Sequence, residues 1–385
     1  MLSGSGGVAD LTITITKDAK QPTTLLWSAV SPHVEMPFTL EPPRSDLGDP
    51  SAFLSEVIRK ASEAFSVEHG FQTLRGMGLT IAGQIPAEIQ DAIRQVADHC
   101  HPAPPTILLA TQDPYIPWEL AVIDPLIGIA GGRSPFLGAQ AIIGRWPLPK
   151  PPPPPRRPPK SVAVSDRVVI SGSYLGVMGA AQLPDAEDEA KCLLEAWPEA
   201  KRVSASFREV MDCLDGDPPA DVLHFALHGK FDESGRQEGI FLIGNQASEG
   251  GPARVEILSP YDVRGSSLSR RAPLIFLNAC QVGASREVLG DYAGMAEAFL
   301  HAGASAVIAP LWSIDDAAAK TLALSFYKSA SGVNSKPPAE ILREERARLS
   351  RSSVRGDPPP PLICLSYQFF GHPLFRMINV VHKEA

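Results

Sequence analysis

Buried strands alternate with amphipathic helices along the second half of this chain, and this pattern constrains the fold more than any other feature. The strand candidates are short apolar runs bounded by turn residues, and the segments between them have helical periodicity. The strand runs are DRVVISGSYL, ADVLHFALHG, GIFLIG, LIFLN and SAVIAPLW, and the helical runs are DAEDEAKCLLEAW, YAGMAEAFLHAG and DDAAAKTLALSFYKSA. Such alternation predicts an α/β fold with a mostly parallel sheet and helices on both of its faces.

A proline-rich stretch, WPLPKPPPPPRRPPK at 146–160, divides the chain. Proline cannot donate to a sheet and favours an extended conformation, so we expect a linker between an N-terminal part, 1–145, and a C-terminal part, 161–385. The N-terminal part is itself α/β, because LTITITKD and TILLAT have strand patterns, whereas 50–66 and PAEIQDAIRQVADHC have helical ones. Near the other end, LICLSYQFF follows a second proline run and is predicted to be an edge strand.

Composition narrows the possible environment and partners. The chain has 385 residues, 44% of them hydrophobic, which is enough for one large or two ordinary domains. The net charge of -8 provides no basic surface for phosphates, so no nucleic-acid partner is expected. No apolar run is long enough to span a membrane, and the first residues lack a basic region followed by an apolar one. We therefore expect a cytoplasmic protein without a membrane partner.

Five scattered cysteines contain no C-x-x-C pair, which argues against both a disulfide framework and a zinc site. The segment DHCHP at 98–102 has metal-binding residue types, but adjacent residues on a helix do not converge on one ion. We expect free thiols and no metal site.

Two of the predicted strands end in chemically reactive residues. ADVLHFALHG ends with His228 and Gly229, and LIFLNAC ends with Asn278 and Cys280. The carboxyl ends of parallel strands share one edge of the sheet, where α/β proteins usually bind ligands. A histidine beside a cysteine can take the thiol proton and create a nucleophile. Cysteine is also among the most often buried residues, so Cys280 could instead be a small core residue.

The other residues of these strand ends have expected supporting roles. His224 lies inside its strand, so we interpret it, together with Asn278, as a supporting residue and His228 as the base. Backbone N–H groups at Gly229 and Cys280 could stabilise the oxyanion of a tetrahedral intermediate. A glycine after a strand is equally well explained by turn formation.

The motifs DVLHFALHGKFD, ILSPYDV, LIFLNACQVG and GMAEAFLHAGASAVIAPLWSIDD resemble, in order and spacing, the CHAT domain, a family of cysteine peptidases related to caspases and separase. The resemblance covers about 161–380. It implies a caspase-like three-layer α/β/α sandwich, a catalytic dyad of His228 and Cys280, and neither metal nor cofactor. YIPWEL resembles a segment found upstream of CHAT domains, which implies a pseudo-caspase-like N-terminal half. The closing segment YQFFGHPLFRMI departs from the family's Trp-Phe pattern, and no function is carried onto it.

APLWSIDDAAAK resembles the separase segment whose acidic residue meets a basic side chain of the substrate. The resemblance implies that Asp315 and Asp316 bind an Arg or Lys of the substrate, by a charge-assisted contact. Both aspartates also precede a helical run, where acidic residues ordinarily cap the helix and favour its dipole.

Together these observations predict a cysteine endopeptidase that cleaves protein substrates after a basic residue. We expect it to be latent until a partner protein activates it, and the resemblance implies a bacterial effector of antiviral defence or cell death. Two alternatives remain: a catalytically inactive CHAT-like scaffold for protein interactions, and a plain α/β ligand-binding domain.

Overall fold

The computed structural model describes residues 7–36, 41–48, 50–64, 70–113, 116–123, 134–148, 157–230, 239–246, 252–279, 287–288, 291–292, 294–312, 315–331, 335–348 and 362–380. The chain divides into two compact units. The first comprises Met1–Lys160, Pro337–Leu365 and Phe369–Phe375, and the second comprises Ser161–Lys336, Ser366–Gln368 and Arg376–Ala385.

The second unit is built on a parallel sheet. Its strands lie in the order β16-β13-β9-β7-β8, and every pair among them with a described register is parallel. The strands are β7 (Arg167–Ser171), β8 (Lys201–Ser204), β9 (Val222–Ala226), β13 (Leu274–Asn278) and β16 (Ala306–Pro310). All residues of β9, β13 and β16 are buried, as expected for strands covered on both faces.

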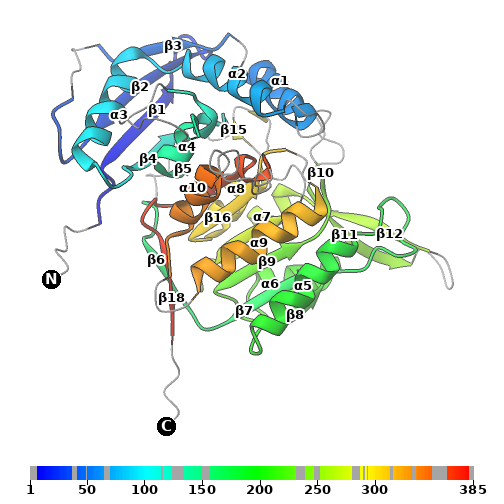
Figure 1. Cartoon of the computed structure of the whole chain (residues 1–385). Coiled ribbons are helices and arrows are strands. Elements are labelled where there is room, and N and C mark those ends of the chain that lie inside the picture. The colour runs from blue at the N-terminus through cyan, green and yellow to red at the C-terminus, as the bar shows by residue number, and fades with distance from the viewer. Residues whose placement is uncertain are drawn as a thin grey trace. The chain divides into compact units, whose positions relative to one another are not determined.

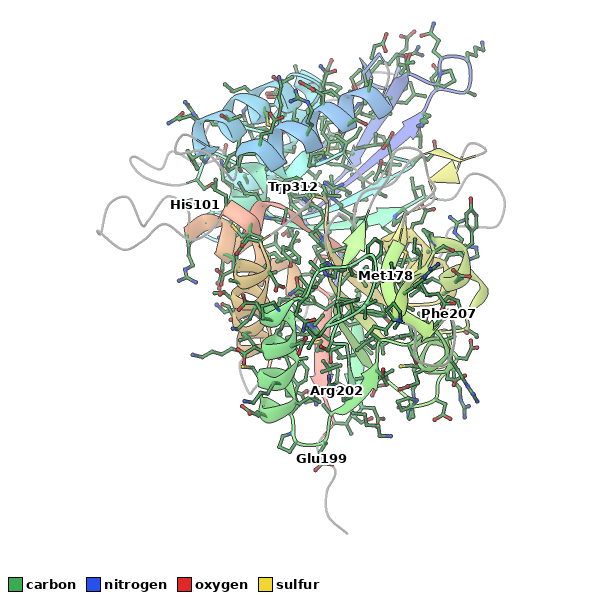
Figure 2. All side chains as sticks on the ribbon, turned by 90° about the vertical axis from the view of Figure 1, so that its right-hand side faces the viewer. His101, Met178, Glu199, Arg202, Phe207 and Trp312 are labelled. Carbon is green, nitrogen blue, oxygen red and sulfur yellow. The ribbon has the colours of Figure 1, made fainter. Side chains whose placement is uncertain are left out.

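Helices cover both faces of this sheet (Figures 1 and 2). α5 (Pro184–Ala196) and α9 (Asp316–Ala330) pack together on one face, and α7 (Pro260–Gly265) and α8 (Met295–Ala302) contact each other on the other. α6 (Phe207–Leu214) connects β8 to β9. In Figure 2, Glu199 and Arg202 mark the turn that leads from α5 into β8. The result is the three-layer α/β/α arrangement expected from the sequence.

Small sheets and hairpins extend the second unit. β10 (Gly229–Lys230), β11 (Gly239–Gln246) and β12 (Ala253–Leu258) form an antiparallel sheet that begins where β9 ends. β14 (Glu287–Val288) pairs with β15 (Asp291–Tyr292), and β6 (Ser161–Val164) pairs in parallel with β18 (Arg376–Asn379). The sheet that contains β10 therefore starts beside the predicted site.

The first unit has its own sheet, with strand order β3-β2-β1-β4-β5. β1 (Leu11–Lys17) pairs antiparallel with β2 (Thr24–Val30) and parallel with β4 (Thr106–Thr111), β3 (Arg44–Asp46) lies beside β2, and β5 (Ile142–Pro147) beside β4. The helical segments are α1 (Pro50–Ala64), α2 (Gly70–Ala82), α3 (Ala87–Cys100), η1 (Trp118–Leu120), α4 (Leu137–Gln140), α10 (Pro338–Arg348) and η2 (Leu362–Leu365).

A buried ion cluster fixes part of the first unit. The carboxylate of Glu119 accepts hydrogen bonds from two guanidinium nitrogens of Arg145, and both side chains are fully buried. Arg346 of α10 is also buried, and its guanidinium donates to the carbonyl of Cys364 at 3.3 Å. The positive charges of Arg145 and Arg346 outweigh the effect of burial and lower the pKa of Glu119. Through Arg346, this cluster holds α10 against the rest of the first unit by charge as well as by packing.

Most predicted elements are confirmed, but GIFLIG, as β11, lies in the small antiparallel sheet rather than in the parallel one, and one strand prediction is wrong. Pro86 precedes α3 as predicted, and α8 ends at Gly303, whose φ of 118° is the left-handed conformation that glycine tolerates best. The predicted edge strand LICLSYQFF is instead η2 followed by β17 (Tyr367–Phe370). β17 has partners on both sides: Phe370 pairs with Arg145 of β5, and Ser366 accepts a hydrogen bond from Leu311, which follows β16. It is therefore not an edge strand.

Candidate active site

Three neighbouring parallel strands deliver the predicted site residues to one edge of the second unit's sheet. β9, β13 and β16 lie side by side in the same direction, so the residues that follow them meet at one edge. His228 and Gly229 follow β9, Asn278 is the last residue of β13, and Asp315 follows β16. Cys280, predicted as the nucleophile, lies outside the described residues, and the described chain ends just before it at the buried Ala279.

His228 is half-buried and held by a backbone carbonyl. Its ring Nε2 lies 2.6 Å from the carbonyl oxygen of Ala181, in the loop between β7 and α5. The ring of Tyr174 meets the imidazole edge-on, with ring centroids 4.8 Å apart. The Tyr174 hydroxyl donates to the carbonyl of Phe241 at 2.6 Å, and the N–H of Phe241 donates to the carbonyl of His228 at 2.9 Å. Side chain and backbone of His228 are thus both fixed by neighbouring segments.

The carbonyl of Ala181 determines which ring nitrogen carries the proton. A carbonyl oxygen only accepts hydrogen bonds, so Nε2 must be the donor at this distance. In the neutral imidazole the proton is then on Nε2, and Nδ1 keeps its lone pair. Nδ1 is therefore the nitrogen that can act as a base.

A buried polar network lies behind the strand ends and was not predicted from the sequence. Nε2 of His224 lies 2.6 Å from one carboxylate oxygen of Glu189, and the amide of Asn278 donates to the other at 2.6 Å. The hydroxyl of Tyr327 lies 3.1 Å from Nδ1 of His224, and the hydroxyl of Tyr367 donates to the amide oxygen of Asn278. The network links α5, β9, β13, α9 and β17.

Burial makes this network energetically important. His224 and Glu189 have side-chain exposures of 0% and 1%, and an unpaired polar group there would lose its hydration without compensation. Burial, followed by the charge of Glu189, raises the pKa of Tyr327 well above its usual value, so its hydroxyl stays protonated. Because Glu189 accepts the hydrogen bond of Asn278, the last residue of β13, it holds the end of the strand that precedes Cys280.

One signal in the sequence could have indicated Glu189. Glu189 lies on the apolar face of α5 together with Ala186, Ala190 and Leu193, and all four residues are buried. A charged residue on the buried face of an amphipathic helix needs a polar partner in the core. His224 in the buried strand β9 is such a partner.

Asp315 and Asp316 have different surroundings. Asp315 is the N-cap of α9, and its carboxylate accepts from the N–H of Ala318 at 3.0 Å. Asp316 is the first residue of α9, and its carboxylate accepts from the N–H of Asp185 at 3.2 Å, at the start of α5. Burial raises the pKa of Asp316 above its usual value, and the negative charges of Asp185 and Glu189 add to this effect. Asp185 also pairs with Lys320, whose ammonium nitrogen lies 3.1 Å from its carboxylate.

The backbone of Gly229 has an N–H group that the adjacent sheet does not use. Gly229 is opposite Ile240 in the antiparallel pair of β10 and β11, and the hydrogen bond beside this pair runs from Phe241 to His228. This pattern makes Gly229 and Ile240 a non-hydrogen-bonded pair, so the N–H of Gly229 points away from β11.

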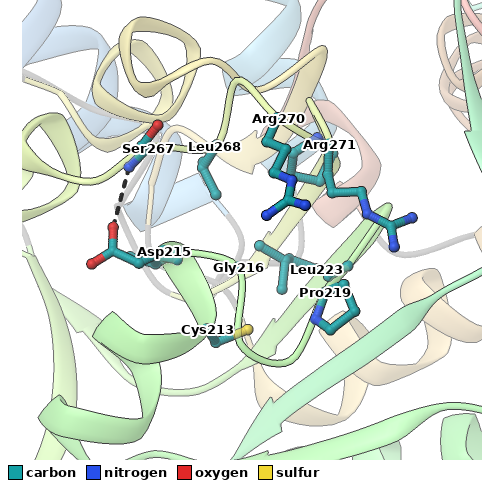
Figure 3. A pocket seen from close by; sticks show the side chains of 12 residues that line it. Cys213, Asp215, Gly216, Pro219, Leu223, Ser267, Leu268, Arg270 and Arg271 are labelled. Atoms are coloured by element: carbon teal, nitrogen blue, oxygen red, sulfur yellow. Dashed lines mark hydrogen bonds between the residues drawn. The ribbon is translucent and has the colours of Figure 1, made fainter.

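A cavity of about 230 Å³ opens elsewhere in the second unit (Figure 3). It is lined by Leu223 near the start of β9 and by Pro273 just before β13, and hence lies at the amino ends of these strands. In its wall, the N–H of Ser267 donates to the carboxylate of Asp215 at 3.3 Å. The cavity is therefore at the opposite edge from His228 and is not part of the candidate active site.

The mixed α/β structure with its large, mostly parallel sheet is similar to the caspase-like fold of separase. The separase of the Saccharomyces cerevisiae separase–securin complex matches with a TM-score of 0.52 and 11% identity over 96% of this chain. The Arg specific cysteine proteinase gingipain R matches with a TM-score of 0.46 and 14% identity, over 77% of this chain and 69% of its own. The protein thus has a caspase-like α/β fold.

Residues 145–373 match the model of the CHAT domain family, and the chain belongs to that family. It spans 30% of the length of the separase chain. No curated protein sequence matches it. Among the described residues, none of the helices combines the length and apolar character that crossing a membrane requires.

Proposed function

We propose that this CHAT domain protein is a cysteine endopeptidase, with Cys280 as nucleophile and His228 as general acid and base. The observation that carries the proposal is the hydrogen bond from Nε2 of His228 to the carbonyl of Ala181, because it leaves Nδ1 as a base on the edge of the sheet that leads to Cys280. A buried structural histidine would have both nitrogens engaged in the core, as His224 has.

The reaction follows from these groups. The thiol proton of Cys280 passes to Nδ1 of His228, and the sulfur attacks the carbonyl carbon of the scissile peptide bond. The imidazolium returns the proton to the amide nitrogen as the C–N bond breaks, which releases the amine and leaves a thioester on Cys280. Water, losing a proton to the same nitrogen, then hydrolyses the thioester to a carboxylic acid and the free thiol.

The tetrahedral intermediate carries a negative charge that needs hydrogen-bond donors. The N–H of Gly229 is a candidate because it points away from β11. The N–H of Cys280 is the second donor in this proposal. Two backbone donors need no side chain, which agrees with the small residue at position 229.

For specificity, we propose that Asp316, with Asp315 beside it, favours a basic residue on the cleaved side of the substrate. The support is electrostatic: Asp316 is half-buried, and its neighbours Asp185 and Glu189 add negative charge. An Arg side chain would relieve this repulsion by a charge-assisted hydrogen bond. Asp315 already caps α9, so its contribution to the substrate site is through charge rather than a free carboxylate.

The proposal includes restraint of the activity. A peptidase that shares a compartment with its substrates needs to be inactive until it is required, so we propose that a partner protein activates it. A cytoplasmic location and a role in bacterial defence or cell death are part of this proposal, and the role rests on the family resemblance alone.

The first experiment is covalent labelling with a thiol-reactive peptidyl probe that carries Arg, compared with one that carries Asp. Wild type, Cys280→Ala and His228→Ala are compared, each before and after limited proteolysis. Burial raises the pKa of Cys213 and of Cys364 to about 12, so neither thiol competes at neutral pH. Cys192 is more exposed, and Cys192→Ser is the matched control.

We expect labelling of wild type and Cys192→Ser by the Arg probe, and its loss in both dyad variants. Equal labelling of Cys280→Ala would disprove the assignment of the nucleophile. No labelling of wild type, even with candidate activators and after proteolysis, would favour the inactive scaffold.

A further inference from the structure

Three side chains with metal-binding atoms meet in the first unit, although they are far apart in the sequence. Asp10 directly precedes β1, His33 lies in the loop after β2, and Cys100 is the last residue of α3. One ligand atom from each residue lies within 4.8 Å of those of the other two. This proximity is close to what one small cation needs in order to bind all three.

The Asp10 carboxylate is already oriented by a second residue. Its Oδ2 accepts hydrogen bonds from the N–H of Thr106 at 2.8 Å and from the Thr106 hydroxyl at 2.7 Å. Its Oδ1 lies 2.8 Å from Nε2 of His33. Metal-binding carboxylates and histidines are typically positioned by such outer hydrogen bonds. Oδ1 is thus the oxygen that faces the other two ligands.

His33 and Cys100 both lie beside the Asp10 carboxylate. The His33 imidazole pairs with it at 2.8 Å, and burial, followed by the charge of Asp10, raises the pKa of the Cys100 thiol to about 11. The His33 ring is also stacked on His99, with centroids 4.7 Å apart, which limits its rotation. Thiolate, imidazole and carboxylate can all bind a divalent cation, and binding of the cation releases the thiol proton.

We propose that Asp10, His33 and Cys100 form a binding site for Zn²⁺. Sulfur, nitrogen and oxygen donors together suit Zn²⁺, whereas Ca²⁺ and Mg²⁺ prefer oxygen ligands only. Three protein ligands leave a fourth position for water, on the side where His33 is exposed. The ion would tie the start of β1, the loop after β2 and the end of α3 together.

The site departs from the expectation of no metal, and it was not apparent from DHCHP alone. Within that segment only Cys100 belongs to the group, and its partners are contributed by two other parts of the fold. The site is also independent of the proposed peptidase dyad, because all three ligands belong to the first unit and His228 to the second.

The test is metal binding by the full chain in a Cys280→Ala background, so that the proposed dyad cannot hold the ion. After treatment with a chelator, Zn²⁺ is titrated calorimetrically, and Co²⁺ is titrated as a spectroscopic probe, because a cobalt–thiolate bond gives a charge-transfer absorption. We expect one ion per chain. His33→Ala should lower the affinity by more than the roughly 100-fold that loss of an outer hydrogen bond can cause. Cys100→Ser should abolish the charge-transfer band.

The matched controls are Cys192→Ser and His301→Ala, which remove the same side-chain types outside the group and should bind as before. Zn²⁺ should also raise the melting temperature of the background protein but not that of His33→Ala, whose exposed side chain makes it the safer variant for folding. Failure of the background protein to bind one Zn²⁺, or unchanged binding and absorption in both ligand variants, would overturn the proposal.

Discussion

The ring Nε2 of His228 lies 2.6 Å from the carbonyl oxygen of Ala181, a residue 47 positions earlier in the chain. This contact connects the end of β9 to the loop between β7 and α5 and specifies the tautomer of the imidazole. It therefore makes the chemistry of His228 testable without knowledge of the substrate.

We expect neutral His228 to carry its proton on Nε2, because a carbonyl oxygen can only accept. Nuclear magnetic resonance of protein with ¹⁵N-labelled histidine distinguishes the two tautomers by the chemical shifts of the ring nitrogens. His228→Ala assigns the signal. A neutral ring protonated on Nδ1 would be incompatible with the proposed role of that nitrogen as the base.

Loss of Glu189 should strongly destabilise the second unit. Glu189→Ala leaves the buried side chains of His224 and Asn278 without their acceptor, and removal of one partner of such a buried pair costs about 3–5 kcal/mol. Urea denaturation measures the change in the free energy of unfolding. Glu195→Ala, on the same helix but with a side-chain exposure of 66%, is the control and should stay within about 0.5 kcal/mol of wild type. Similar values for both variants would mean that the network contributes little to stability.

Substitutions of the two aspartates at the start of α9 should affect stability and substrate specificity to different extents. Asp315→Ala removes the cap on Ala318 and should lower the free energy of unfolding by about 1 kcal/mol. The loss of its charge should lower kcat/KM for Arg substrates less than Asp316→Asn does. Asp316→Asn keeps an oxygen for the N–H of Asp185 but removes the charge. It should lower kcat/KM for Arg substrates by roughly 10- to 100-fold, the equivalent of a charge-assisted hydrogen bond of about 1.5–3 kcal/mol. An equal loss on neutral substrates would assign Asp316 to folding instead.

Asp221 should contribute to acid sensitivity. Burial raises the pKa of its carboxyl, but hydrogen bonds from the backbone of Asp166 and Ser165, together with Arg271, outweigh burial and hold the pKa below its usual value. A carboxyl with a lowered pKa in the folded state stabilises the protein above its unfolded pKa, and this stabilisation is lost as the pH falls through the folded pKa. Asp221→Asn should therefore reduce stability at neutral pH and flatten its dependence on pH below about 4.

Denaturation at a series of pH values measures this effect. Asp212→Asn is the control, since its side chain is 60% exposed. A pH profile of Asp221→Asn with the slope of wild type would contradict the assignment.

The periodicity of the sequence was sufficient to predict most of the strands of the second unit's parallel sheet and the helices that cover it. It did not show that GIFLIG, as β11, lies in a separate antiparallel sheet. Local patterns determine helices and strands, and β9, β13 and β16 are buried throughout because both of their faces are covered. The same reasoning predicted that His228 and Asn278 come at strand ends. It failed for LICLSYQFF, because whether a strand has one neighbour or two depends on the pairing of segments that are distant in sequence.

Only the tertiary structure determined which polar groups are hydrogen-bond partners or lie close together. No local pattern links His228 to the carbonyl of Ala181, His224 to Glu189, or Asp10 to Cys100, since hydrogen-bond partners are chosen by the packing of whole elements. The sequence alone determined the residue types that can carry the chemistry and the edge of the sheet where they lie. The fold determined which nitrogen of His228 carries the proton and which side chains hold His224 and Asn278 in place. In the first unit it also brought Asp10, His33 and Cys100 together. All of these depend on distances between elements rather than along the chain.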